Sequence, residues 1–219
     1  MMKNQEFFSA IAAGQVEKVQ EGLSADPGLL NAKNENDVSA VLFSVYVGRT
    51  EIAKLLIDRG ADLDLFEAAA TGTQERLELL LRKNPASINS FSAEGWTPLH
   101  LAVFFGRINI VHLLLSKGAN INIPSKNDQR VSPLHSALAN PQNSAVGQLL
   151  IGAGADLNVR QSEGYTPLHY AAANGLDQVV RSLIAHSADQ TIKNHQGKTA
   201  HDLAVERGKT STADLLKAR

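Results

Sequence analysis

The sequence contains no cysteine, which excludes disulfide bonds, thiol catalysis and cysteine-ligated zinc. An excess of one charge is also missing, because 21 basic and 22 acidic residues leave a formal net charge of −1. Neither sign forms a long run, so the chain lacks a broad electrostatic surface for nucleic acid or anionic lipid. We therefore expect no nucleic-acid partner and no membrane partner.

Long apolar runs are absent as well. No run approaches the roughly 18 residues of a membrane-spanning helix. The apolar stretch at residues 7–13 is short and lies between Glu6 and Glu17, unlike the core of a signal peptide. Hydrophobic residues still make up 43% of the 219 residues, which is enough for a real core. The sequence therefore predicts a folded, soluble protein, and we expect a cytoplasmic location.

What the sequence does contain is an internal repeat. Three segments begin alike, with TPLH at 97–100, SPLH at 132–135 and TPLH at 166–169, at spacings of 35 and 34 residues. Each has an alanine two residues after its histidine, and a small-residue turn such as GAN or GAD follows later. Weaker copies extend the pattern, so we count seven repeats, beginning near residues 5, 39, 63, 97, 132, 166 and 199.

These segments resemble the ankyrin repeat family, through TPLH-x-A, SPLH-x-A and the GA[DN] turns. The repeats near residues 5 and 63 are similar to the looser repeats of bacterial ankyrin proteins. The resemblance covers nearly the whole chain and implies an all-α solenoid. In such a fold each repeat is two antiparallel helices followed by a projecting hairpin loop. Two short helices cannot bury both of their faces alone, so neighbouring repeats must stack. We therefore predict one ankyrin-repeat domain over residues 1–219.

Individual residues predict the same helices. Thr97 is a suitable N-cap, Pro98 suits the first helical position, and Gly106 can end the helix in a left-handed conformation. Leu99 should be buried. The second helix of this repeat is predicted to bury Ile108, Val111, Leu114 and Leu115.

One connection departs from the pattern. The repeats at 39 and 63 begin only 24 residues apart, so about one hairpin loop is missing between them. Asp64 and Glu67 have the spacing of a capping box, which would begin the next helix without a TPLH segment.

The seven histidines raise the question of a metal or acid–base site. His100, His135 and His169 occupy equivalent positions in successive repeats, and packed helices lie ~8–10 Å apart. Side chains at that separation cannot share zinc, whose bonds are ~2 Å long. We predict that each imidazole bonds the Thr or Ser hydroxyl of its own repeat and nearby backbone, as the resemblance also implies. The glycines at 152–156 follow a helix, so they form a turn and not a phosphate loop.

No catalytic motif appears, and we predict neither a catalytic site nor a bound cofactor or metal. The resemblance implies that a partner protein binds a concave surface formed by the first helices and the hairpin loops. The residues predicted on that surface are Tyr46, Val47, Ala70, Thr71, Trp96, Phe104, Phe105, Val131, Asn140, Tyr165 and Asn174. The sequence thus predicts a scaffold that binds an unidentified protein, as a monomer with self-association left open.

The adjacent Phe104 and Phe105 raise a sharper expectation. We expect a notch where the loop is missing, with Ala70 and Thr71 on its floor and aromatic side chains on its walls. Tyr46 and Val47 would form one wall, and Phe104, Phe105 and Trp96 the other. Alternatively, the phenylalanines fill the space left by the loop.

Two other functions stay open: an enzyme or small-molecule binder with an unrecognised groove site, and a structural protein that assembles with copies of itself. Converging polar groups with perturbed pKa values would favour the first, and an apolar groove favours protein binding.

Overall fold

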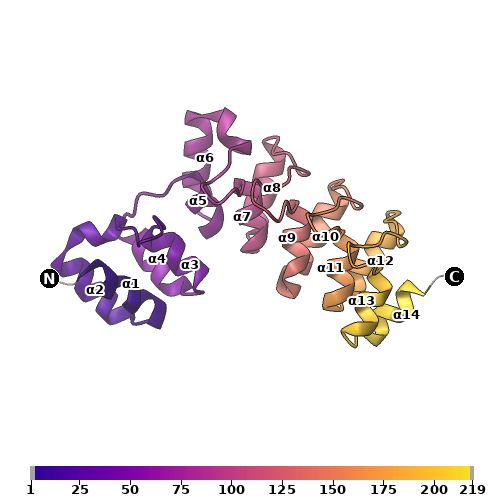
Figure 1. Ribbon diagram of the computed structural model, residues 1–219. Helices are drawn as coiled ribbons and strands as arrows, with labels where there is room; N and C mark the ends of the chain where they lie inside the picture. Colours follow the sequence, from indigo (N-terminus) through magenta and orange to yellow (C-terminus); the bar gives the residue numbers. More distant parts are fainter. Residues whose placement is uncertain (1–2, 218–219) are drawn as a thin grey trace. The chain divides into compact units, whose positions relative to one another are not determined.

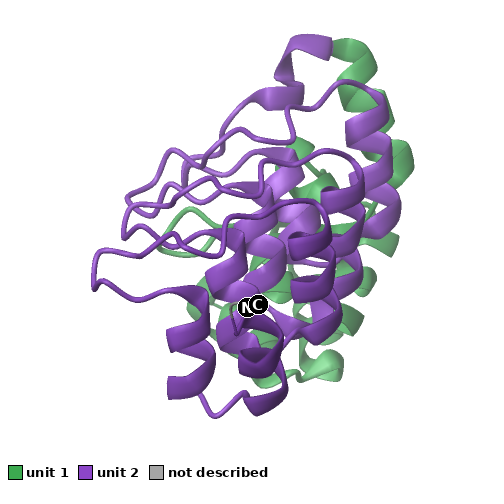
Figure 2. Cartoon of the chain, turned by 90° about the vertical axis from the view of Figure 1, so that its right-hand side faces the viewer, with its two compact units in different colours: residues 1–83 green, residues 84–219 purple. Residues whose placement is uncertain are grey.

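A computed structural model describes residues 3–217 and contains fourteen α-helices and three short 3-10 helices in that range (Figure 1). The extended segments of these residues contribute only an isolated bridge between Lys33 and Ser39. The prediction of an all-α fold is therefore confirmed. None of the helices among these residues is long and apolar enough to cross a membrane. The chain divides into two compact units, residues 1–83 and residues 84–219 (Figure 2). The prediction of a single repeat domain stays a prediction.

Unit 1 consists of three helical hairpins. Its elements are α1 (Asn4–Ala13), α2 (Val16–Ala25), η1 (Pro27–Asn31), α3 (Ala40–Tyr46), α4 (Thr50–Asp58), α5 (Leu65–Thr71) and α6 (Gln74–Lys83). The first helices pack in a row, with α3 contacting both α1 and α5. Phe7, Ile11, Ile52 and Leu56 are buried between the helices and form the centre of the core.

Unit 2 consists of four helical hairpins after a short helix. Its elements are η2 (Pro85–Asn89), α7 (Pro98–Phe104), α8 (Ile108–Ser116), α9 (Pro133–Ala139), η3 (Pro141–Asn143), α10 (Ser144–Gly152), α11 (Pro167–Asn174), α12 (Asp177–Ala185), α13 (Ala200–Glu206) and α14 (Thr210–Leu216). The first helices α7, α9, α11 and α13 pack side by side in chain order. Figure 2 shows the loops of this unit projecting to one side of its helices.

Short-range capping explains where these helices begin and end. Thr97 Oγ1 accepts a hydrogen bond from His100 N at 3.3 Å, with Pro98 at the first helical position. Gly106 follows the helix with φ of 67°, as predicted. The predicted capping box is confirmed too. Asp64 Oδ1 accepts from Glu67 N at 2.8 Å, and Glu67 Oε2 accepts from Asp64 N at 2.7 Å.

Burial follows the predicted pattern in α7 and departs from it in α8. Leu99 is 1% exposed, as expected for a residue between stacked hairpins. The buried stripe of α8 consists of Ile110, Val111 and Leu114, whereas Leu115, which was also predicted to be buried, is half-buried. The prediction was wrong for Ile108, which is 38% exposed because it is the first residue of the helix and precedes the turn that faces the core.

Asparagine side chains join successive repeats within each unit. Asn122 Oδ1 accepts a hydrogen bond from Asp156 N at 2.8 Å, and Asn158 Oδ1 accepts from Asp189 N at 2.8 Å. Asn31 bonds Asp62 N in unit 1 in the same way, at 2.9 Å. Each bond satisfies a backbone N–H just after a second helix, so each repeat fixes the position of the next one.

Candidate partner-binding surface

The motif histidines of unit 2 bridge successive repeats. His100 Nδ1 lies 2.8 Å from Thr97 Oγ1, and His100 Nε2 lies 3.0 Å from the carbonyl oxygen of Val131 in the next repeat. A carbonyl can only accept, so Nε2 carries the proton and Nδ1 accepts from the hydroxyl. His135 and His169 make equivalent bonds. The predicted bonding to the motif hydroxyl and backbone is confirmed.

Burial keeps these imidazoles neutral. It lowers the pKa of His100 and of His135 from 6.5 to about 4, and it also lowers the pKa of His169. Rings whose pKa is lowered by burial and whose two nitrogens are both bonded are poorly suited to acid–base catalysis near pH 7. These three side chains are therefore structural parts of the repeat.

The fourth repeat of unit 2 ends this series of bridges. Asp202 stands where the other repeats have histidine, and its Oδ2 accepts from Thr199 N and Thr199 Oγ1, both at 2.8 Å. The carboxylate thus accepts these hydrogen bonds within its own repeat. Among the described residues, no three histidine or acidic side chains gather closely enough to hold a metal ion.

Aromatic side chains lie at both ends of α7, and of these Phe104 is the exposed one. Phe104 is 49% exposed, and its ring meets that of Phe105 edge to face, with centroids 5.0 Å apart. Trp96 precedes the helix, is half-buried, and lies 5.6 Å from the His100 ring. Phe104, Phe105 and Trp96 are the α7 aromatic residues. A large apolar side chain left half exposed is costly in water, so Phe104 offers surface to a partner.

A second feature of this surface is a hollow of about 300 Å³ between α9, α11 and the end of α13. We call it the tyrosine hollow. Its lining consists of Ala139, Gln161, Glu163, Tyr165, His169, Tyr170, Ala173, Asn174 and Arg207. The rings of Tyr165 and Tyr170 lie 6.0 Å apart. Burial raises the pKa of Tyr170, so its hydroxyl stays protonated and can donate a hydrogen bond.

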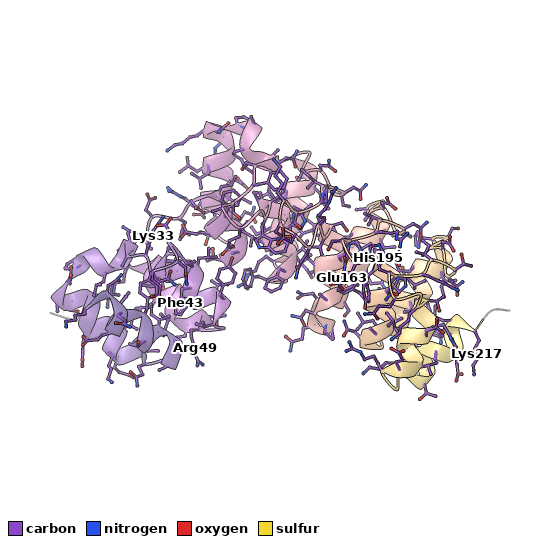
Figure 3. The ribbon with its side chains drawn as sticks, in the orientation of Figure 1. Lys33, Phe43, Arg49, Glu163, His195 and Lys217 are labelled. Carbon is purple, nitrogen blue, oxygen red and sulfur yellow. The ribbon has the colours of Figure 1, made fainter. Side chains whose placement is uncertain are left out.

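The hairpins beside the tyrosine hollow are held together by backbone bonds. His195 N donates to the carbonyl oxygen of Glu163 at 3.0 Å, and Figure 3 shows these two residues side by side. Ser162 N donates to the carbonyl of Gln129 at 3.0 Å in the same way. The hairpin edge of the surface is therefore a connected row.

Three predicted residues of unit 2 have structural roles. Asn174 Nδ2 donates to the Leu138 carbonyl at 2.8 Å, satisfying an acceptor at the end of α9. Asn140 Oδ1 accepts from Gln142 N at 3.0 Å and begins η3. Val131 is only 7% exposed. Asn174 also lines the tyrosine hollow.

Sequence reasoning did not assign Tyr170 or Arg207 to the surface. Tyr170 lies four residues after its motif threonine, where the other repeats of unit 2 have the buried Leu101, Ser136 and Leu203. A larger polar ring at that position was the signal that could have found it.

In unit 1 the predicted residues differ in exposure. Tyr46 is 38% exposed at the end of α3, and Val47 is half-buried. Ala70 is fully buried, so it offers no surface. Thr71 Oγ1 donates to the Glu67 carbonyl at 2.7 Å. The predicted notch combines these residues with others of unit 2, and it stays a prediction.

Comparison with known proteins bears on the repeat pattern. The family description "Ankyrin repeats (3 copies)" matches residues 64–125 and 134–219. The chain belongs to the ankyrin-repeat family. Ankyrin repeats are protein-interaction modules in general.

The relatives differ greatly in length. The chain is 27% identical over 179 residues to the nuclear factor NF-kappa-B p105 subunit of Gallus gallus, covering 77% of the chain and 18% of that protein. It is 33% identical over 135 residues to the E3 ubiquitin-protein ligase KEG of Arabidopsis thaliana, covering 59% of the chain and 8% of that protein. The probable 26S proteasome regulatory subunit p28 of Saccharomyces cerevisiae is 28% identical over 219 residues, covering 93% of the chain and 95% of that protein.

Proposed function

We propose that this ankyrin-repeat protein is a non-catalytic scaffold that binds a partner protein through the first helices of unit 2. The observation that carries the proposal is the half-exposed Phe104 ring at the end of α7. Binding hot spots are enriched in large side chains that become fully buried in the complex. Completing the burial of a half-exposed phenylalanine contributes about 1 kcal/mol, since full burial is worth about 1.5–3 kcal/mol.

The tyrosine hollow supports the same role. Tyr165 and Tyr170 present apolar rings with polar ends, which suits an interface with mixed chemistry. Glu163 and Arg207 line the hollow with opposite charges, and these can orient a bound segment. The near full-length similarity to a protein named as a proteasome regulatory subunit also supports a role in docking onto another protein, without identifying that protein for this chain.

The proposal is tested with peptides selected from a random displayed library on the immobilised full chain. The selected peptides are then titrated against Phe104→Ala, Tyr165→Ala and the control Ile108→Ala. Ile108 is a suitable control because it is also exposed and apolar, yet lies on the second helix of its repeat. We expect about a tenfold loss of affinity, about 1.4 kcal/mol, for the first two variants and no change for the control.

Peptides that bind all four proteins equally would contradict the proposed surface. Selection that enriches nothing beyond the heat-unfolded protein would contradict binding through a folded surface.

A further inference from the structure

A second hollow of unit 2 lies outside the surface proposed above. We call it the loop hollow. It has a volume of about 560 Å³, and its lining includes Phe91, Ile123, Pro124, Lys126, Asn127 and Arg130. It lies between the segment after η2 and the loop that leads from α8 to α9. None of the residues assigned to the α7 aromatic residues or the tyrosine hollow lines it.

The loop hollow combines an apolar floor with charge of one sign. Phe91, Ile123 and Pro124 supply the apolar surface, and Lys126 and Arg130 supply two cations. Lys126 Nζ lies 4.4 Å from the centroid of the Phe91 ring, so the ammonium is held over the floor. The described residues that line the hollow include no acidic side chain.

Arg130 has an unusual backbone conformation. In the hairpins at 92–96, 161–165 and 194–198, the residue before the last is a glycine with positive φ, namely Gly95, Gly164 and Gly197. Arg130 occupies the corresponding place in the hairpin at 125–131, with φ of 50°. Glycine adopts this conformation without a steric penalty, whereas arginine does not. Asp37 occupies the same place in the hairpin at 34–38 with φ of 59°, so a positive φ belongs to this hairpin position, and Arg130 places a cation where three other hairpins have glycine.

The hairpin that carries both cations is fixed in place. Ser125 N donates to the Val131 carbonyl at 2.8 Å and closes the hairpin. Lys126 N donates to the Gly95 carbonyl at 2.9 Å and joins it to the preceding hairpin. The Lys126 backbone approaches Gly95 so closely that a Cβ there would lie 2.8 Å from the Lys126 carbonyl carbon. The cations therefore extend from a rigid base, which lowers the entropy lost on binding.

We propose that the loop hollow is a second binding surface of the scaffold, for a protein segment that places carboxylate side chains on either side of an apolar one. The apolar side chain would cover Phe91 and Ile123, and the carboxylates would pair with Lys126 and Arg130. Charge complementarity selects this occupant, because the lining offers cations and apolar surface but no carboxylate. Asp128, at the tip of the same hairpin, lies outside the lining, so its carboxylate opposes an acidic segment less directly than Lys126 and Arg130 attract it.

The test uses the fluorescein-labelled peptide Gly-Glu-Leu-Glu-Gly, with Gly-Gln-Leu-Gln-Gly and Gly-Glu-Ser-Glu-Gly as matched probes. Affinity is measured by fluorescence anisotropy on the full chain, and the site is mapped by amide chemical shifts in NMR. We expect the first peptide to bind most tightly and to shift the amides of residues 123 and 125–130. We expect Lys126→Gln combined with Arg130→Gln to lower the affinity for this peptide at least about tenfold.

The control is Lys117→Gln combined with Arg181→Gln, which removes the same charge from exposed positions of unit 2 outside the lining. Arg130→Gly gives a second readout. It should raise the Tm, because glycine adopts positive φ without a steric penalty, and it should lower the affinity for the peptide. Equal weakening by the control, equal binding to Arg130→Gly, or shifts confined to the tyrosine hollow would each overturn the proposal.

Two other occupants are distinguished in the same experiment. Concentration-dependent self-association that Lys126→Gln and Arg130→Gln abolish would replace the acidic segment with a second copy of the chain. Tighter binding of an oligothymidylate than of the peptide would identify a polyanion site instead. Peptides selected for the tyrosine hollow should bind the Lys126→Gln, Arg130→Gln variant normally, so the two proposals fail independently.

Discussion

Lowering the pH from about 7 to about 5 should destabilise unit 2 through its buried histidines. Burial lowers the pKa of His100 and of His135 from 6.5 to about 4 in the folded chain. The unfolded chain therefore binds protons below pH 6.5 that the folded chain does not yet bind. Stability contributed by these rings is present above pH 6.5 and is lost as the pH falls towards 4. At about pH 5 linkage gives roughly 2 kcal/mol for each ring and roughly 4 kcal/mol for both.

Such a loss is a large share of the ~5–15 kcal/mol that stabilises a typical domain. The assay is urea unfolding followed by circular dichroism at a series of pH values. His100→Gln keeps a donor and an acceptor but cannot titrate, so it should remove about half of the loss between pH 7 and pH 5. His112→Gln, on the exposed face of α8, is the matched control.

NMR of the imidazole nitrogens provides an independent check. The rings of His100 and His135 should stay neutral, with the proton on Nε2, until the pH approaches 4. An unfolding free energy that is equal at pH 7 and pH 5 would refute the reasoning. So would rings that titrate near 6.5 in the folded protein.

Three further predictions concern single side chains. Leu99→Ala should lower the free energy of unfolding by about 2–5 kcal/mol in denaturant titrations, because it leaves a cavity between stacked repeats; a loss below about half a kcal/mol would contradict that packing. Phe104→Ala should change the same quantity by under about 1 kcal/mol, since half of the ring is already exposed. Burial raises the pKa of Glu67, which accepts from Ser39 Oγ and Asp64 N and lies near Lys33, so its contribution to stability falls as the pH rises above 4.5. Glu67→Gln should flatten that part of the pH profile, and an unchanged slope would show that the carboxyl does not titrate there.

Local patterns predicted the helices well because their causes are local. The bond between Thr97 and His100 spans three residues, and the Asp64–Glu67 capping box spans the same distance. The boundary of α8 was less predictable. An apolar side chain at the first helical position, such as Ile108, looks like a core residue until the helix start is known.

The candidate site was less predictable because it depends on contacts between repeats. The tyrosine hollow joins Tyr170 of one repeat to Arg207 of the next, and no spacing within one repeat reveals that meeting. Arg130 illustrates the same limit, since it lines the loop hollow together with Phe91 of the preceding repeat. Asn174 satisfied the family spacing, but its amide serves the end of α9.

The imidazole bridges give unit 2 a direction. Each histidine donates forward, from its own repeat to the carbonyl at the start of the next, and Asp202 turns the corresponding bonds inward. Lengthening the array by gene duplication would therefore succeed more readily when the new copy is inserted before Thr199 than after it. A copy placed before Thr199 would accept a histidine bond from the preceding repeat and donate one to the following repeat. A copy placed after the Thr199 repeat would follow Asp202, so the carbonyl at its start would have no imidazole donor. Asp202 therefore determines on which side of Thr199 a repeat can be added with its imidazole bonds intact.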